Sequence, residues 1–304
     1  MDDSNTYPLL YQNVDLTPKI TVRNINYNLP IIEKFREAND FKRILRSAHA
    51  IDSSYDVVFI WDVEEITWLD TEYIEDVIYP GLELDLFSQL IKKILAKNQF
   101  SALDETPEND VVNIEDAVDD GTANMKRLAP KYALLEQFYN EIWNGMRDDG
   151  PIMNYELLEK CEMSIEASDL YIQADMVQTI ISNRWKCVKP CLELVIKRSA
   201  ETGKKYTNAV ISDEGVGSAA AQLLVSGHAK LVPIENIYST FKASPESVYE
   251  RIRRKFGEKC TFVVVTSHPP TMELARKLNM LPWCVWTPNL IQDLYNAERD
   301  VFLQ

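Results

Sequence analysis

The stretch YDVVFIWD, residues 55–62, decides the fold class of this chain of 304 residues. Residues 57–61 are all apolar and are either β-branched or aromatic, which is typical of a strand covered on both faces in a parallel sheet. The run ends at Asp62. Because ligands of open α/β sheets bind beyond the carboxyl ends of the strands, this carboxylate is expected to face the functional site.

Strands and helices alternate from residue 207 to the last residue of the chain. Strands are predicted at 207–212, within 231–239, at 260–267 and at 282–286, and helices at 219–227, 244–257, 271–279 and 289–302. Ser244 and Pro245 are typical of a helix start, and Gly257 of a helix end. The alternation predicts βαβ units and one parallel sheet that includes residues 55–62.

A long segment with helical periodicity separates the first strand from the others. Helices are predicted at 84–100, 126–146, 154–161 and 166–200, with an acidic loop at 101–124 and a further helix at 31–50. The sequence therefore predicts an α/β fold with a Rossmann-like core at 55–71 and 205–304. A helical-bundle cap at 72–204 interrupts this core after its first strand. Residues 1–54 are expected to form a partly disordered N-terminal extension.

Composition excludes several classes of protein. The net charge of −15, from 32 basic and 47 acidic residues, disfavours direct binding of nucleic acid, because such a surface repels phosphate. No signal peptide or long apolar run is present, so we expect a soluble intracellular protein without a membrane span. The five cysteines suggest no disulfide framework, and Cys187 and Cys191 are expected to be buried thiols rather than zinc ligands.

Polar side chains follow the other predicted strands as well. Ser212 ends one strand, the triplet 266–268 (Thr-Ser-His) follows another, and Lys242 lies in a loop before a helix. An aspartate, a hydroxyl and a lysine at one edge of a sheet make a phosphate site, in which the aspartate attacks phosphorus. The alternative, that Asp62 only caps a following helix or turn, stays open on strand position alone.

Several segments resemble the eyes absent family of haloacid-dehalogenase-type hydrolases. VFIWDVEEI (58–66) resembles the family's V-F-V-W-D-L-D-E-T, and PIENIYSTFKASPESVYERIRRKFG (233–257) is similar to its P-I-E-N-I-Y-S-A-T-K, E-S-C-F-E-R-I and closing F-G. The similarity continues through CTFVVVTS (260–267) and ARKLNMLPW (275–283), and cap segments are similar at 111–121 and 125–140. The resemblance covers residues 55–304 and implies a haloacid-dehalogenase-like core.

The resemblance also implies roles for single residues. Asp62 matches the nucleophile that forms an aspartyl-phosphate, and Glu64 matches the general acid/base position, with one methylene more than the family's aspartate. Ser212 and Lys242 match the phosphate-binding residues. Asp62 and Glu64 are the implied ligands of Mg²⁺, but Ser267 occupies the place of the metal-binding aspartate of the fourth motif.

Two functional hypotheses follow from the resemblance. The favoured one is a domain with weakened phosphatase chemistry that acts as a transcriptional co-regulator, in nucleus and cytoplasm. Its partners would be homeodomain-type transcription factors and other co-regulators. The alternative is a fully active Mg²⁺-dependent protein tyrosine phosphatase acting on phosphotyrosine proteins, with Asp213 or Glu214 replacing the missing carboxylate. The alternative for Glu64 and Glu65 is that both side chains are simply solvated, and His268 is expected to be a turn residue rather than a catalytic base.

Overall fold

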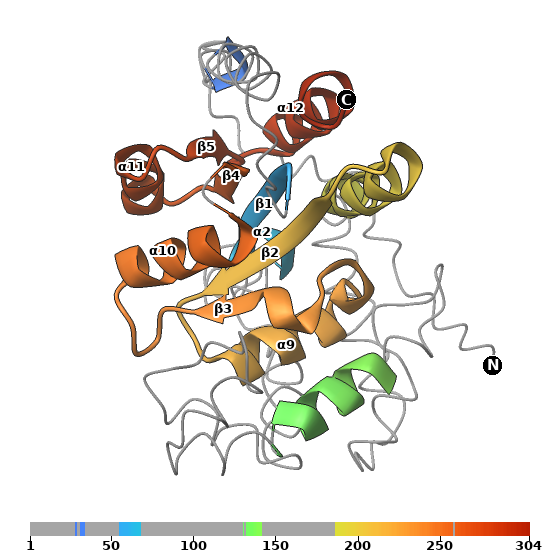
Figure 1. Ribbon diagram of the computed structural model, residues 1–304, viewed down its shortest axis with the longest axis vertical. Coiled ribbons are helices and arrows are strands. Elements are labelled where there is room, and N and C mark those ends of the chain that lie inside the picture. The colour runs from blue at the N-terminus through green and yellow to red at the C-terminus, as the bar shows by residue number, and fades with distance from the viewer. Residues whose placement is uncertain are drawn as a thin grey trace, which may run out of the picture.

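The computed structural model describes residues 28, 31–33, 55–67, 130, 132–141, 186–257 and 259–304. Within these residues five strands form one sheet in the order β3-β2-β1-β4-β5, and every neighbouring pair is parallel (Figure 1). The strands are Val57–Asp62 (β1), Tyr206–Ser212 (β2), Ile237–Ser239 (β3), Thr261–Thr266 (β4) and Leu281–Cys284 (β5). The predicted α/β fold with a parallel sheet is confirmed.

Strand β1 lies at the centre of the sheet. Val57 pairs with Tyr206 of β2 and Thr261 of β4, and Trp61 pairs with Val210 and Val265 at the other end of the strand. Its first five residues are buried, as the continuous apolar run predicts, because neighbouring strands cover both edges and helices cover both faces. The polar residue that ends β1 is therefore positioned by the middle of the fold.

The side chains of β1 alternate between two apolar clusters. Phe59 and Trp61 pack into the larger cluster with helix 186–202, α9 (Val216–Val225) and α12 (Pro288–Ala297). Val58 and Ile60 pack into the second cluster with α10 (Pro245–Phe256) and α11 (Pro269–Lys277). In Figure 1 α10 and α11 lie on one side of the sheet, and α12 and helix 186–202 on the other. Since strand side chains alternate, Asp62 lies on the face covered by α10.

The predicted ends of α10 are confirmed. The Ser244 hydroxyl accepts a hydrogen bond from the backbone N–H of Ser247 at 3.3 Å, and Pro245 is the first helical residue. Gly257 follows the last turn with φ of 100°, a conformation that costs glycine little because it has no Cβ. A well-defined start fixes where the first turns of α10 lie against the carboxyl ends of the strands.

Several short elements differ from the simple alternation. The predicted strand within 231–239 is confirmed only at β3, because two short 3-10 helices, Ala229–Leu231 (η3) and Ile234–Asn236 (η4), occupy the preceding residues. The predicted helix 289–302 ends as α12 and continues as a π-helical turn, Glu298–Phe302 (η5). A short helix that was not predicted, Val63–Thr67 (α2), follows β1 directly.

Two helices of the long insertion contact the core. The Tyr139 hydroxyl, on the helical stretch 132–141, donates to the backbone carbonyls of Ala229 and Val232 at 3.0 Å each. Helix 186–202 packs on the sheet, and its Leu192 carbonyl accepts a hydrogen bond from the side chain of Asn208 at 3.0 Å. The predicted helices 84–100 and 154–161, the acidic loop 101–124 and most of the extension and the cap lie outside the described residues.

Two tryptophans and three cysteines lie in the core. Trp61, Trp283 and Cys191 are fully buried, and Cys260 and Cys284 are nearly so. Cys187 is half-buried, and within the described residues these four cysteines form no disulfide. No helix in the described part of the chain is long and apolar enough to cross a membrane.

Candidate active site

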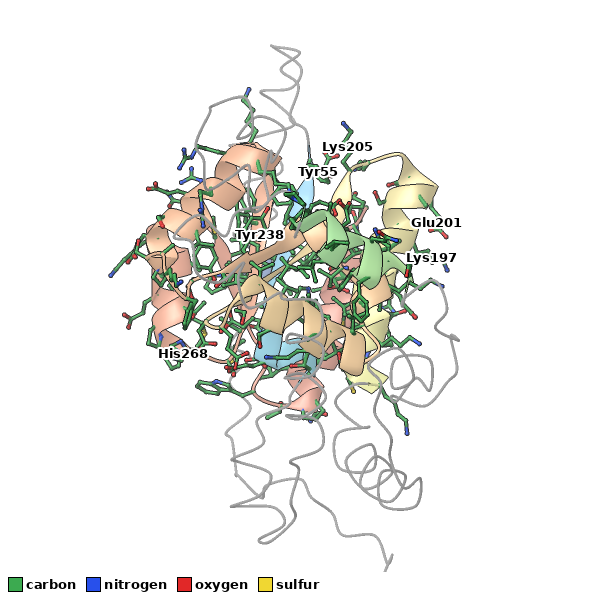
Figure 2. The ribbon with its side chains drawn as sticks, turned by 90° about the horizontal axis from the view of Figure 1, so that it is seen from below. Tyr55, Lys197, Glu201, Lys205, Tyr238 and His268 are labelled. Atoms are coloured by element: carbon green, nitrogen blue, oxygen red, sulfur yellow. The ribbon has the colours of Figure 1, made fainter. Side chains whose placement is uncertain are left out.

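Three strands end in polar side chains at one edge of the sheet. Asp62 is the last residue of β1, Ser212 of β2 and Thr266 of β4. The strands are parallel, so these residues share the edge at which ligands of such sheets bind. Figure 2 shows His268, which follows β4, at the opposite end of the sheet from Lys205, which precedes β2. Each of these three strand ends therefore carries a polar side chain, as the sequence indicates.

Asp62 is bonded to the end of the neighbouring strand. The Thr266 hydroxyl donates to Asp62 Oδ2, and the oxygen of the same hydroxyl accepts the backbone N–H of His268 at 2.9 Å. The register explains the contact, because Trp61 pairs with Val265 and the next residue of each strand lies on the face covered by α10. Thr266 is fully buried, so this relay orients the Asp62 carboxyl from within the protein.

The surroundings of Asp62 disfavour its charge. Burial raises the pKa of Asp62 from 3.8 to about 7, against the hydrogen bond from Thr266, which lowers it. The nearby charges of Glu65, Glu64 and Asp213 raise it further, because like charges oppose ionisation. Glu65, Glu64 and Asp213, the charged groups that act on Asp62, are all negative. The site therefore favours an incoming cation or a neutral hydrogen-bond donor over an anion.

Of the two glutamates after Asp62, Glu65 is buried at the strand ends and Glu64 is exposed. Glu64, at the predicted acid/base position, is exposed, whereas Glu65 is 5% exposed and accepts the backbone N–H of Ser267 at 2.5 Å. The alternative that both side chains are solvated is right for Glu64 and wrong for Glu65. The reason is helix α2, which begins directly after Asp62 and turns residues three apart towards the same side. Glu65, not Glu64, joins the exit of β1 to the exit of β4.

The burial of Glu65 was not predicted, although the sequence around it carries a signal. The stretch 63–67 has apolar residues at 63 and 66, a spacing of three that suits one helical turn. A helix starting at residue 63 places the side chain of Glu65 against the sheet and that of Glu64 towards solvent. The family motif instead directed attention to the residue two positions after Asp62.

Ser212 is bonded within its own loop. Its hydroxyl accepts the backbone N–H of Glu214 at 3.0 Å, and the Glu214 carboxylate accepts from the Ser218 hydroxyl and, at 3.0 Å, from the Gln222 amide. Glu214 is thereby committed to α9. Asp213 is exposed and close enough to act on the charge of Asp62. Alternation along β2 places Ser212 on the face covered by α9, whereas Asp62 lies on the face covered by α10.

Lys242 lies in the loop after β3, beside the ring of Phe241. It is exposed, and its Nζ is 5.7 Å from the centroid of the Phe241 ring, which is itself 57% exposed. Among the residues with described side chains, no ion pair with Lys242 is found. The predicted phosphate-binding lysine is therefore present after β3, and it is not among the groups that shift the pKa of Asp62.

The side chains present fall short of a protein-built magnesium site. Mg²⁺ prefers oxygen ligands, carboxylates above all, in near-octahedral geometry. Within the described residues no group of three His, Cys, Asp or Glu side chains is arranged to hold a metal. One oxygen of Asp62 already accepts from Thr266, and Glu65 Oε1 accepts from Ser267, whose own side chain is a hydroxyl. The implied Mg²⁺ does not fit this donor set, and no step below depends on it.

A parallel α/β sheet whose central strand ends in an aspartate beside hydroxyl groups defines a domain of the haloacid-dehalogenase-like class. No family model matches the chain. It is 36% identical over 271 residues to "Protein phosphatase eya-1" of Caenorhabditis elegans, which covers 81% of this chain and 54% of that protein. It is 39% identical over 138 residues, 45% of this chain, to the whole chicken sequence named "Protein phosphatase EYA3".

The chain belongs to the eyes absent family of protein phosphatases. A human relative, "Protein phosphatase EYA2", is 27% identical over 161 residues, which is 52% of this chain and 26% of that protein. The chain thus spans about half the length of the nematode relative and less of the human one. The resemblance found in the sequence is confirmed, and so is its divergence.

Proposed function

We propose that this chain is an eyes absent phosphatase domain with weakened phosphoryl-transfer chemistry that acts as a transcriptional co-regulator through protein partners. The partners are homeodomain-type transcription factors and other co-regulators, and the places of action are the nucleus and the cytoplasm. The observation that carries the proposal is Ser267, a hydroxyl at the exit of β4 where a third carboxylate would complete a metal site beside Asp62 and Glu65.

The proposed residual reaction has two steps. A carboxylate oxygen of Asp62 forms a bond to phosphorus while the bond from phosphorus to the phenolic oxygen of the substrate breaks, and water then releases phosphate from the acyl phosphate. The leaving oxygen takes a proton from Glu64, the predicted acid, or from water. Such transfer depends on electrostatic stabilisation of the phosphoryl oxygens, and each lost stabiliser costs on the order of 10²–10³-fold in rate.

The charges at the strand exits support weak chemistry. An anionic phosphate ester approaching Asp62 meets the negative charges of Glu64, Glu65 and Asp213. Lys242, which the resemblance implies as a counter-charge, lies over the Phe241 ring. The Thr266 hydroxyl orients Asp62 but adds no positive charge. These features are compatible with binding at this edge and unfavourable for rapid turnover.

The alternative is the fully active Mg²⁺-dependent protein tyrosine phosphatase. One observation favours it: acidic side chains surround Asp62 and raise its pKa. A bound divalent cation would reduce the repulsion among these negative charges. Mg²⁺ is also bound in proteins by only one or two carboxylates together with water and substrate phosphate. In that case Asp62 and Glu65 would be its carboxylate ligands.

Hydrolysis of an aryl phosphate separates the two proposals. Purified wild-type protein, Asp62→Asn and Ser267→Asp are compared with and without Mg²⁺. Weakened chemistry predicts slow hydrolysis by the wild type with little stimulation by Mg²⁺, loss of this activity in Asp62→Asn, and at least about tenfold stimulation in Ser267→Asp. Strong stimulation of the wild type by Mg²⁺, abolished in Asp62→Asn, would establish the alternative.

The co-regulator role has its own test. Binding of a purified homeodomain-type partner to wild-type protein and to Asp62→Asn is measured by calorimetry. Equal affinities, together with a large difference in hydrolysis, are expected because partner binding needs the fold and not the nucleophile. An absence of binding to several such partners would contradict the co-regulator role while leaving the phosphatase question open.

A further inference from the structure

The hydroxyl of Tyr249 is buried without a hydrogen-bond partner. Tyr249 lies near the start of α10 and is 2% exposed, and its hydroxyl oxygen makes no hydrogen bond within the described structure. Phenolic hydroxyls that are buried usually find a partner, because the group loses its bonds to water on folding. A bound ligand would explain why the Tyr249 hydroxyl has no hydrogen-bond partner within the protein.

Tyr249 and Asp62 lie on the same face of the sheet. The Tyr249 side chain packs in the cluster with Ile60 and Ile211, and the alternation along β1 places Asp62 next on this face. Asp62 is also the charged group whose field reaches the Tyr249 hydroxyl. The phenol therefore belongs to the part of α10 that covers the carboxyl end of β1, close enough to Asp62 to feel its charge.

The chemistry of the phenol suits a donor. Burial raises the pKa of Tyr249 well above its ordinary value, and the negative charge of Asp62 raises it further, so the hydroxyl keeps its proton at every physiological pH. Asp62 Oδ2 is already bonded to Thr266, and no hydrogen bond joins Asp62 to Tyr249. The acceptor that the hydroxyl lacks is therefore not supplied by the neighbouring protein groups that the structure describes.

We propose that the Tyr249 hydroxyl donates a hydrogen bond to an oxygen of a phosphoryl group, or of inorganic phosphate, bound at Asp62. The inference rests on the proposed function, because it takes the exit of β1 as the phosphate-binding place. It adds a donor that neither the motifs nor the resemblance assigned. Where the surrounding charges are negative, a neutral donor attracts phosphate oxygens without placing another charge in the core.

The test uses the full chain and inorganic phosphate. Phosphate affinity is measured by isothermal titration calorimetry for wild type, Tyr249→Phe, Tyr206→Phe and Asp62→Asn. Tyr206 is the matched control, because its hydroxyl bonds the Gln304 carbonyl at 3.1 Å and its strand begins at the opposite edge of the sheet. Tyr249→Phe is expected to bind phosphate about tenfold more weakly with an unchanged or raised melting temperature, whereas Tyr206→Phe keeps the wild-type affinity.

A second measurement follows Tyr249 directly in the wild-type protein while phosphate binds. In protein with ¹³C-labelled tyrosine rings, the resonance assigned by its absence from Tyr249→Phe shifts as phosphate is added, and that of Tyr206 does not. Unchanged phosphate affinity in folded Tyr249→Phe, or a Tyr249 resonance that ignores saturating phosphate, overturns the inference.

Failure of the proposed function has a different signature. Asp62→Asn is expected to strengthen phosphate binding, because it removes the repulsion between carboxylate and phosphate. If wild type and Asp62→Asn both bind no phosphate, the phosphate site itself is refuted, and the role of Tyr249 with it. If both bind and Tyr249→Phe binds equally well, only the role of Tyr249 is refuted.

Discussion

Two buried carboxyl groups in this molecule have similar electrostatics and different surroundings. Asp62 lies at the exit of β1, where Thr266 donates to it. Glu298 lies at the start of η5, is fully buried, and neither of its carboxyl oxygens has a hydrogen-bond partner among the described residues. Burial raises the pKa of both groups, that of Asp62 to about 7 and that of Glu298 well above its ordinary value.

The difference shows that a raised pKa does not by itself identify a site. Glu298 packs among apolar residues that cover the sheet, and the titratable group it acts on is the thiol of Cys191. Asp62 instead meets a hydroxyl donor and three acidic neighbours where strands end. Convergence of polar groups at an open edge of the sheet, and not burial alone, marks the candidate site.

The largest expected effect distinguishes Asp62 by its pH dependence. Between pH 3.8 and about 7 the folded protein keeps the proton of Asp62, whereas the unfolded chain releases it. The contribution of Asp62 to the free energy of unfolding is therefore largest below pH 3.8 and is lost as the pH rises to about 7. Asp62→Asn removes this loss and is expected to gain up to about 4 kcal/mol over wild type between pH 4 and pH 8. Urea unfolding at several pH values measures it.

The exposed Asp293 provides the control for this comparison. Asp293→Asn is expected to follow the wild type at each pH, since its side chain faces water. If the stability curves of wild type and Asp62→Asn ran parallel over this pH range, the pKa of Asp62 would not be raised in the folded protein. The electrostatic description of the site would then be wrong.

The next effect concerns Glu298. Glu298→Met replaces a buried carboxyl that lacks partners with an apolar side chain of similar length. At pH 7 the variant is expected to be more stable by about 1–3 kcal/mol, because an unsatisfied buried polar group is removed. The gain should shrink as pH falls towards 4.5, where the unfolded chain also holds the proton. A destabilised variant at pH 7 would reveal a hydrogen bond or a role for Glu298.

Thr266→Val makes Asp62 resemble Glu298. The variant removes the donor to Asp62 and leaves the His268 N–H without its acceptor, which is expected to cost about 1–2 kcal/mol of stability. The pKa of Asp62 is expected to rise further, since the bond from Thr266 lowers it. Side-chain ¹³C NMR of Asp62 follows the titration. An unchanged pKa in a folded variant would show that the Thr266 contact is absent in solution.

The smallest effect tests the placement of Glu64 and Glu65. Glu65→Gln keeps an acceptor for the Ser267 N–H and removes a charge, so stability should change by less than about 1 kcal/mol while the pKa of Asp62 falls. Glu64→Gln is the matched variant at an exposed position and should lower that pKa less, because Glu65 contributes more. A larger change in the pKa of Asp62 from Glu64→Gln than from Glu65→Gln would contradict the placement of Glu65 as the closer carboxylate.

Much of the fold was predictable from sequence because it depends on local patterns. The apolar run before Asp62 and the capping residues at Ser244 and Gly257 identify β1 and α10 without further information. Alternation with helices predicted that the strands are parallel, but it did not predict their order in the sheet. The helical cap, by contrast, stays a prediction, since most of 72–204 lies outside the described residues.

The candidate site was less predictable because it depends on register. That Thr266 lies beside Asp62 follows from the pairing of Trp61 with Val265, which no local pattern encodes. The burial of Glu65 depends on a helix of five residues, α2. The contact of Lys242 with the Phe241 ring depends on the path of the chain after β3. The roles implied for Asp62, Glu64, Ser212, Lys242 and Ser267 remain predictions.

Magnesium binding tests the central claim most directly. Calorimetric titration of Mg²⁺ into wild-type protein and Ser267→Asp compares the present donor set with one that has a third carboxylate at the exit of β4. The account predicts no measurable binding to the wild type at millimolar Mg²⁺ and saturable binding to Ser267→Asp. Saturable binding to the wild type, lost in Asp62→Asn, would contradict the claim that this edge of the sheet lacks a magnesium site.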